Sequence, residues 1–184
     1  PAGHRRCADR RNACGWQVAM GFAYGELGLY AEAERALREA LTESERMGLH
    51  NLSVRAKNNL GNILCRRGAL DEARRFEEQA VQACMAQGDP RLEAASRNYL
   101  AHILELGGDR EGALREARKA AELASETPTL RAHAHGRISR LLRAMGQRAE
   151  ALEEARAASV LLEGLGRIDE GESEIRLALA ERSE

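Results

Sequence analysis

The side chains best suited to acid–base or metal chemistry in this 184-residue sequence are five histidines and a few glutamate pairs. His133 and His135 are two residues apart, which on a helix turns them about 200° from one another, so they do not chelate one metal. His102 and Glu105 have the i, i+3 spacing of helix neighbours, but the sequence shows no third partner for them. We therefore expect surface histidines and no catalytic centre.

Other candidate motifs also have ordinary interpretations. The pairs Glu77-Glu78 and Glu153-Glu154 are expected on the solvated outer face of helices. The glycine-dense stretch from Gly164 to Gly171 lacks the spacing of a phosphate-binding loop and the preceding strand, so we interpret it as a linker. Kinase catalytic motifs are also missing from the sequence. These observations predict a chain that is not an enzyme and that binds no cofactor and no metal.

Cysteine usage and composition limit the setting. The four cysteines form no C-x-x-C pair, which argues against a zinc or redox site and favours a reduced, cytoplasmic protein. A net charge of -1 with 31% charged residues provides no overall field for nucleic acid, and the apolar runs are too short to span a membrane. Because the sequence begins at Pro1, we expect it to be a fragment of a larger protein.

The elements that must position any site follow a repeat of about 40 residues. Glycines recur at spacings of 40, 40 and 38 residues, and small residues recur at fixed offsets from them. Small residues at fixed positions allow two antiparallel helices to cross closely. Large residues then fill the remaining space, and we expect Leu37 to do so in repeat one and Phe76 to compensate for Glu77 in repeat two. The glycines are Gly28, Gly68, Gly108 and Gly146, and the small columns are Ala33, Ala73, Ala113 and Ala151; Ala40, Ala80, Ala120 and Ala158; and Gly21, Gly61, Ala101 and Ser139.

Turn residues divide each repeat into two helices. The recurring glycines suit left-handed helix caps, and Asp89-Pro90 and Thr127-Pro128 suit an N-cap followed by proline in the first helical position. We therefore predict helix pairs over 14–47, 53–87, 91–125 and 129–163, with one last helix over 168–182.

These columns resemble the tetratricopeptide repeat motif, in which a large residue, a small residue, an aromatic or leucine, glycine, alanine and alanine follow at set spacings. Repeat one provides Met20, Gly21, Tyr24, Gly28, Ala33 and Ala40. The resemblance implies an all-α, right-handed solenoid of about four antiparallel helix pairs. The domains expected are an N-terminal helical extension over 1–13, repeats over 14–53, 54–93, 94–131 and 132–163, and a linker with a capping helix over 164–184. The long repeat resembles a subtype found beside Ser/Thr kinase domains and nucleotide-binding switch regulators in bacterial signalling proteins.

The resemblance also implies a binding groove, because the first helix of each pair lines the concave surface in this family. The groove positions carry many basic and amide side chains, and the first helices of repeats two and four hold several arginines and no acid over 54–68 and 132–146. We therefore expect a basic groove and an acidic protein or peptide partner. The groove residues are Arg55, Asn58, Asn59, Asn62, Arg66, Asn98, His102, Glu105, His133, Arg137, Arg140 and Arg143.

The leading functional hypothesis is a protein-interaction module of a cytoplasmic bacterial signalling protein. Two alternatives stay open. One is a structural role in which the array forms a homodimer, and the other is a sensor that binds a peptide or small ligand. Trp16 is a candidate anchor for a partner, while Tyr24 is expected in the core.

Overall fold

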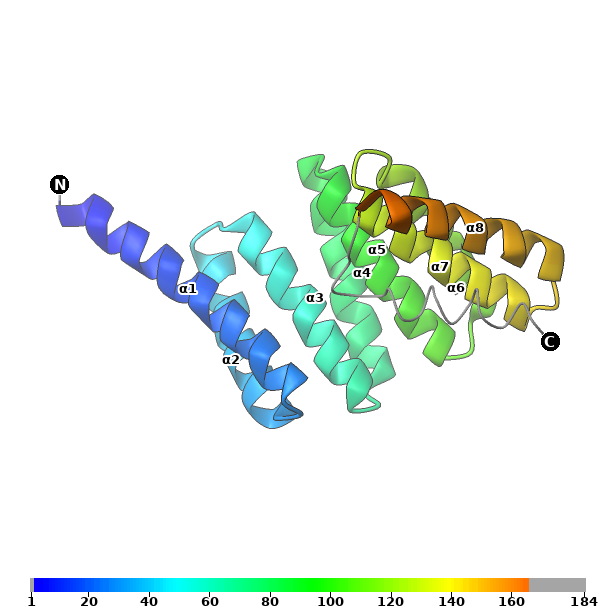
Figure 1. The fold of residues 1–184 in the computed structure, drawn as a ribbon. Coiled ribbons are helices and arrows are strands. Elements are labelled where there is room, and N and C mark those ends of the chain that lie inside the picture. Colours follow the sequence, from blue (N-terminus) through cyan, green and yellow to red (C-terminus); the bar gives the residue numbers. More distant parts are fainter. Residues whose placement is uncertain (1, 166–184) are drawn as a thin grey trace. The chain divides into compact units, whose positions relative to one another are not determined.

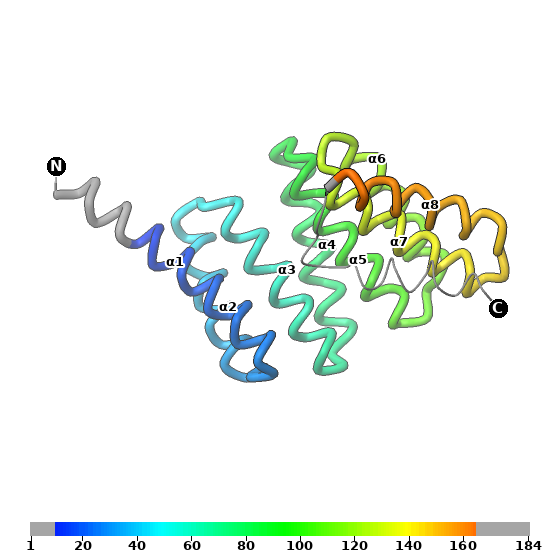
Figure 2. Tube along the Cα trace, in the orientation of Figure 1, coloured from blue at the N-terminus to red at the C-terminus, as the bar shows by residue number. Residues whose placement is uncertain are grey.

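The computed structural model describes residues 2–165, and every element in this range is a helix (Figure 1). The chain divides into two compact units, residues 1–87 and 88–184, which are described separately. Successive helices within a unit reverse direction, as the tube in Figure 2 shows. The expected all-α class and the pairing of helices are confirmed. The first unit holds α1 (Ala2–Glu26), α2 (Tyr30–Arg46), α3 (His50–Arg66) and α4 (Leu70–Gln87); the second holds α5 (Pro90–Leu106), α6 (Arg110–Leu123), α7 (Pro128–Ala144) and α8 (Arg148–Leu165).

Two other expectations concern the ends of the chain. Residues 2–13 are helical and continuous with the rest of α1. The helix expected over 168–182 lies outside the described residues. None of the described helices is long and apolar enough to cross a membrane.

Left-handed glycines end the helices where the sequence predicts them. Gly28 has φ 77°, and its N–H donates to the Gly25 carbonyl (3.1 Å) while the Leu29 N–H reaches back to the Tyr24 carbonyl (2.9 Å). This pair of bonds is the Schellman motif, which satisfies carbonyls at the helix end and needs a residue without a Cβ clash. Gly68, Gly108 and Gly146 also have positive φ, and so do two glycines between repeats that the repeat columns missed, Gly48 and Gly88.

Helix starts agree only partly with the expected caps. Asp89 accepts a hydrogen bond from the Leu92 N–H (3.0 Å), so the Asp-Pro start of α5 is capped as expected. Asp109 caps α6 in the same way. Thr127 precedes Pro128 at the start of α7, but its side chain makes no capping bond there. Proline at the first position fixes the backbone for the helix without a side-chain cap.

The small columns form the helix–helix contacts. Ala33, Ala73, Ala113 and their counterparts are buried in every repeat. Where the first helix has glycine, the second helix has a large residue opposite: a Cβ added at Gly21 would lie 2.5 Å from Leu37 Cγ. Where the first helix has a larger residue, the second helix has alanine, as with Ala101 and Ala117 or Ser139 and Ala155. The two residues that face one another, one from each helix, thus keep the side-chain volume at each crossing nearly constant.

Glu77 occupies the large position in repeat two, and the expectation that it lies on a solvated face is wrong. Its side chain is 0% exposed, and a Cβ at Gly61 would lie 2.5 Å from its Oε1 atom. Phe76, expected to compensate by packing in the core, is only half-buried and has the Arg38 guanidinium 5.9 Å from its ring centroid. The long Glu77 side chain therefore fills the space that Leu37 fills in repeat one.

Candidate functional site

The most concentrated polar site at the expected groove positions lies between α5 and α7 in the second unit. Glu105 of α5 accepts two hydrogen bonds from Arg140 of α7, from Nε (3.0 Å) and Nη2 (2.8 Å), in a bidentate fork. Arg137 Nη1 lies 3.3 Å from the same carboxylate and 3.1 Å from Nδ1 of His102. We call these four residues, His102, Glu105, Arg137 and Arg140, the α5/α7 cluster.

The repeat explains why these side chains meet. His102 and Glu105 are three residues apart on α5, and Arg137 and Arg140 have the same spacing on α7, so each pair lies on one helix face. The helices α5 and α7 are first helices of successive pairs and contact one another within the unit. The arrangement therefore depends on the helix pairing that the small columns produce.

The hydrogen bond between Arg137 and His102 fixes the histidine tautomer. A guanidinium group only donates hydrogen bonds, so the Nδ1 atom of His102 must accept. In this arrangement the ring is neutral and carries its proton on Nε2. His102 thus helps to hold Arg137 in place.

The α5/α7 cluster has more positive than negative charge. Two guanidinium groups share one carboxylate, and α7 contains no acidic residue over its whole length. The side chains are partly accessible, with 15% of Arg137, 19% of Glu105 and 32% of Arg140 exposed. The cluster can therefore present hydrogen-bond donors and positive charge to a ligand, while Glu105 holds the arginines in a fixed orientation.

The remaining predicted residues of this unit lie on the same two helices as the cluster. Asn98 is half-buried, and its side-chain amide donates to the Leu130 carbonyl (3.3 Å). His133 is half-buried, with its Nε2 atom enclosed and without a hydrogen-bond partner among the described residues. Arg143 is exposed, three residues beyond Arg140 on α7.

The predicted residues of the first unit form a thinner polar surface on α3. Arg66 is exposed and pairs with Glu26 (3.0 Å), and it also approaches the Gly25 carbonyl (3.5 Å). Asn58 is buried, and Asn59, Asn62 and Arg55 are half-buried or exposed. The acids that pair with these arginines lie on neighbouring first helices: Glu26 of α1 pairs with Arg66, and Glu105 of α5 pairs with Arg137 and Arg140. Glu105 is itself one of the predicted groove residues. The basic character expected from counting α3 and α7 alone is thus partly neutralised.

A polar column that sequence reasoning missed joins the first and second helices in all four repeats. In each repeat, the residue four positions before the small residue of the first helix has a nitrogen-bearing side chain. This side chain pairs with a glutamate of a second helix. The small residues are Gly21, Gly61, Ala101 and Ser139. In repeats three and four the glutamates are themselves equivalent, Glu116 and Glu154. The contacts are Gln17 to Glu39 (3.3 Å), Lys57 to Glu45 (2.8 Å), Arg97 to Glu116, and His135 to Glu154 (2.6 Å).

Burial gives this column its structural role. The side chains of Lys57 and Arg97 are only 10% and 9% exposed, so each buried cation requires its acidic partner. For Arg97, burial lowers the pKa, but hydrogen bonds to Glu93 and Glu116 outweigh it and raise the pKa above the ordinary value. The sequence signal was available, because glutamine, lysine, arginine and histidine recur at the same offset. It was missed because these residue types differ.

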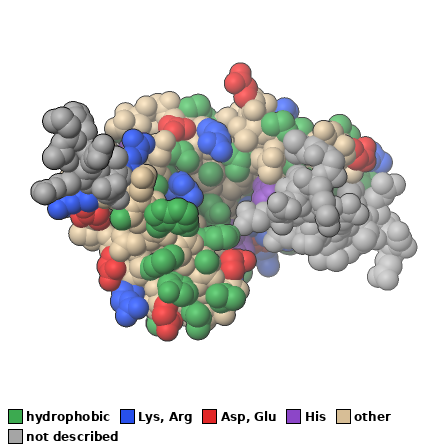
Figure 3. Space-filling view, turned by 60° about the vertical axis from the view of Figure 1, so that its left-hand side comes forward, with side chains coloured by type: hydrophobic (Ala, Val, Ile, Leu, Met, Phe, Trp, Pro, Cys, Tyr) green, Lys and Arg blue, Asp and Glu red, His purple; other side chains and the backbone are tan. Residues whose placement is uncertain are grey.

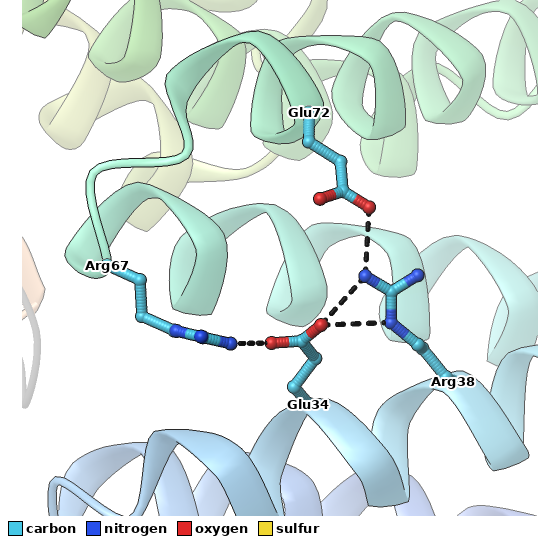
Figure 4. A network of polar contacts seen from close by, with 4 residues as sticks. All are labelled: Glu34, Arg38, Arg67 and Glu72. Atoms are coloured by element: carbon cyan, nitrogen blue, oxygen red, sulfur yellow. Dashed lines mark hydrogen bonds and ion pairs between the residues drawn. The ribbon is translucent and has the colours of Figure 1, made fainter.

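A second network at the surface of the first unit links α2, the end of α3 and α4. Glu34 accepts hydrogen bonds from Arg38 (2.8 Å) and from Arg67, and Arg38 also reaches Glu72 (2.8 Å), as Figure 4 shows. The hydrogen bonds to Glu72 and Glu34 raise the pKa of Arg38. Every charge in this network is compensated, so we assign it to the packing of consecutive helices and not to ligand binding.

The described residues hold no group of three histidine, cysteine or acidic side chains placed to bind a metal ion. Cys14 is buried, and its thiol lies 3.4 Å from the Ala40 carbonyl. Burial is the main cause that raises the pKa of this thiol, which keeps it protonated and unreactive. What the described polar sites do present is hydrogen-bond donors and charge on helix faces.

Comparison with known proteins supports this architecture. Residues 13–86 match the family model described as tetratricopeptide repeat. No match was found among curated proteins. Among solved structures, BtubC (BKLC) from P. vanneervenii is similar, with a TM-score of 0.73 and 16% identity over 86% of this chain and 66% of that one.

Two further solved structures share the fold. One is the Rap conjugation gene regulator of the plasmid pLS20 in complex with the Phr* peptide, with a TM-score of 0.75 and 18% identity over 92% of this chain and 52% of that one. The other is a structure of nearly identical TPR-like repeats of a kinesin light chain from Podosopora anserina. Its TM-score is 0.68, with 18% identity over 90% of this chain and 86% of that one.

These identities establish a shared fold and no shared ligand. The chain spans about two thirds of the first of these proteins and about half of the second. The family model and the helix-pair architecture agree with the small columns and the glycine caps described above. Residues 13–86 therefore carry the sequence signature of the tetratricopeptide repeat, and the described chain shares the fold of solved TPR-like repeats.

Proposed function

We propose that this chain is a protein-interaction module that binds an acidic peptide or protein surface through the first helices of its repeats, with the α5/α7 cluster as the main contact. The observation that carries the proposal is the fork of Arg140 and Arg137 around Glu105. It provides partly exposed guanidinium groups in a fixed orientation, which suits recognition of carboxylates.

Charge around the cluster favours an acidic ligand. Arg143 adds an exposed guanidinium on the same helix, and α7 contains no acidic residue over Pro128–Ala144. The half-buried His102 adds a polar ring for contact with the backbone of an extended peptide. A peptide in complex with the Rap regulator, a protein of the same fold, supports this type of ligand for our chain. A place in a cytoplasmic bacterial signalling protein is part of the same proposal.

The test is an array of short acidic, neutral and basic peptides probed with the labelled chain at low and high salt. We expect acidic peptides to bind, and their signal to fall with salt because exposed charges contribute the attraction. The variant Arg140→Glu with Arg143→Glu should lose this binding. The matched control is Arg115→Glu, which changes an exposed arginine of α6 away from the cluster.

Three results would count against the proposal. Preferential capture of basic or apolar peptides would show that the proposed preference for acidic ligands is wrong. Equal binding by the double variant would show that the α5/α7 cluster is not the contact. A similar loss in Arg115→Glu would show that only the overall charge matters.

A further inference from the structure

The helix α1 exposes an apolar stripe on one face. Trp16 is 72% exposed, Met20 is 48% exposed and Leu27, in the turn after the helix, is 73% exposed. Ala13, one turn before Trp16, and Ala23, between Met20 and Leu27, are also exposed, and the Leu27 N–H still donates to the Ala23 carbonyl (3.1 Å). Figure 3 shows hydrophobic side chains gathered on the surface that the first unit turns toward the viewer.

The three central positions of the stripe, those of Trp16, Met20 and Ala23, are buried on α3 and α7, the first helices that follow another helix in their unit. Met20 corresponds to Leu60 on α3 and to Ile138 on α7, which are 0% and 2% exposed. These two helices pack against the preceding second helices, α2 and α6. The central part of the stripe on α1 is therefore a surface of the kind that packs against a helix elsewhere in the chain.

The spacing of the stripe suits a two-helix interface. Ala13, Trp16, Met20, Ala23 and Leu27 follow one another at intervals of 3, 4, 3 and 4, which is the seam of a coiled coil. From residue 12 to residue 25 the helix contains no charged side chain. A stripe of this length rises about 21 Å along the helix, at about 1.5 Å per residue.

The order of large and small residues makes the stripe complementary to itself. If two copies of α1 pair antiparallel about a two-fold axis at Met20, Trp16 of one copy lies opposite Ala23 of the other, and Leu27 lies opposite Ala13. Large residues then face small ones in both directions, as a two-fold interface requires. The ends add charge complementarity, because Arg10 and Arg11 precede the stripe and Glu26 lies at its other end.

We propose that the exposed face of α1 is a homodimer interface, in which two copies of this chain pair antiparallel through Ala13, Trp16, Met20, Ala23 and Leu27. This inference does not depend on the proposed peptide site. The five side chains of the stripe cover a smaller area than the about 800 Å² per partner that stable complexes bury. The dimer is therefore reversible, and its population changes with protein concentration in the micromolar range.

The sole tryptophan of the chain gives a direct readout, because Trp16 lies in the proposed interface. Sedimentation velocity and tryptophan emission would be measured on the full chain from about 1 to about 200 µM, a range that brackets micromolar affinity. We expect the weight-average mass to double with concentration, and the emission maximum to shift to shorter wavelength over the same range as the indole leaves water.

Two exposed residues provide matched variants. Met20→Glu places two carboxylates together on the axis and should raise the dissociation constant about a hundredfold or more. Val160→Glu changes a 67% exposed residue of α8 in the same way and should leave dimerisation unchanged. Circular dichroism of both variants checks that the helices remain folded, which the exposure of both sites favours.

The pairing of large and small residues has its own test. Ala23→Trp places two large side chains opposite one another and should weaken the dimer, while Ala23→Trp with Trp16→Ala exchanges large and small and should restore it. A chain that stays monomeric at about 200 µM, about a hundred times a low-micromolar Kd, overturns the proposal and leaves the face to another partner. A dimer with unchanged Trp16 emission, or one lost equally in Val160→Glu, overturns it as well.

Discussion

Glu77 should make the stability of the first unit depend on pH in a direction opposite to that of a salt-bridged acid. The side chain is 0% exposed, and burial raises its pKa well above the ordinary value. The folded protein therefore keeps a proton that the unfolded chain has released. Stability is then greatest below the ordinary glutamate pKa of about 4.3, and it is lost as pH rises toward the folded pKa.

The size of the effect follows from proton linkage. Each pH unit between the unfolded and folded pKa lowers the free energy of unfolding by about 1.4 kcal/mol. The total cost depends on how far burial raises the folded pKa above the unfolded one, and it is subtracted from the modest stability of a domain. Glu77→Gln keeps the shape and cannot ionise, so it removes this dependence. Glu77→Leu introduces the side chain that repeat one has at the equivalent position, where Leu37 faces Gly21.

Urea unfolding followed by circular dichroism would measure the effect at about pH 5 and about pH 8. We expect the stability of Glu77→Gln relative to wild type to increase between these values, by about 1.4 kcal/mol for each pH unit up to the folded pKa. Glu77→Leu should show the same change. The difference between variant and wild type cancels the contributions of other titrating groups. Parallel pH profiles for wild type and Glu77→Gln would refute the burial of a protonated Glu77.

Three other expectations concern packing and charge. Gly21→Ala should destabilise the protein by about 2 kcal/mol in thermal unfolding, because the added Cβ overlaps Leu37 Cγ, whereas helix propensity alone would make alanine stabilising by up to about 1 kcal/mol. Ala113→Arg should cost about 3 kcal/mol or more, since Ala113 is fully buried at the crossing of α5 and α6, and a melting temperature close to wild type would contradict the small-column argument. Glu105→Gln should lower stability by about 1 to 3 kcal/mol and strengthen binding of acidic peptides, because it leaves Arg137 and Arg140 without their shared carboxylate; weaker binding would mean that Glu105 itself contacts the ligand.

The fold was predictable from the sequence because its constraints are local and repeat at fixed offsets. Gly28, Gly68, Gly108 and Gly146 have the left-handed conformation that their positions after each first helix predict. The alanine columns are buried because only small residues fit where the helices cross. Such rules need no knowledge of distant contacts, and four copies of the pattern reinforce one another.

The fate of individual polar side chains was harder to predict because it depends on the residue opposite. Glu77 appears solvated when it is considered with Glu78, and it is buried because Gly61 leaves room for it. A small residue on the first helix is compensated in volume by a large residue opposite it on the second helix. This relation becomes visible only when the two facing positions are compared repeat by repeat.

The electrostatics of the candidate site depends likewise on contacts between helices. Counting charges on α7 alone suggests a fully basic surface, but Glu105 comes from α5 and pairs with two of its arginines. The hydrogen bond from Arg137 to His102 also joins residues 35 apart in sequence. The residue types and their helix faces were predictable, while the partners were not.

The most direct test of the proposed interaction site is hydrogen exchange of the chain with and without the acidic peptide that binds best in the array. We predict slower exchange of the amides of α5 and α7 on binding, because a ligand held by the α5/α7 cluster stabilises the helices that carry it. The variant Arg140→Glu with Arg143→Glu should show no such slowing at the same peptide concentration. Protection confined to the second helices α6 and α8, or protection that persists in the double variant, would contradict the account.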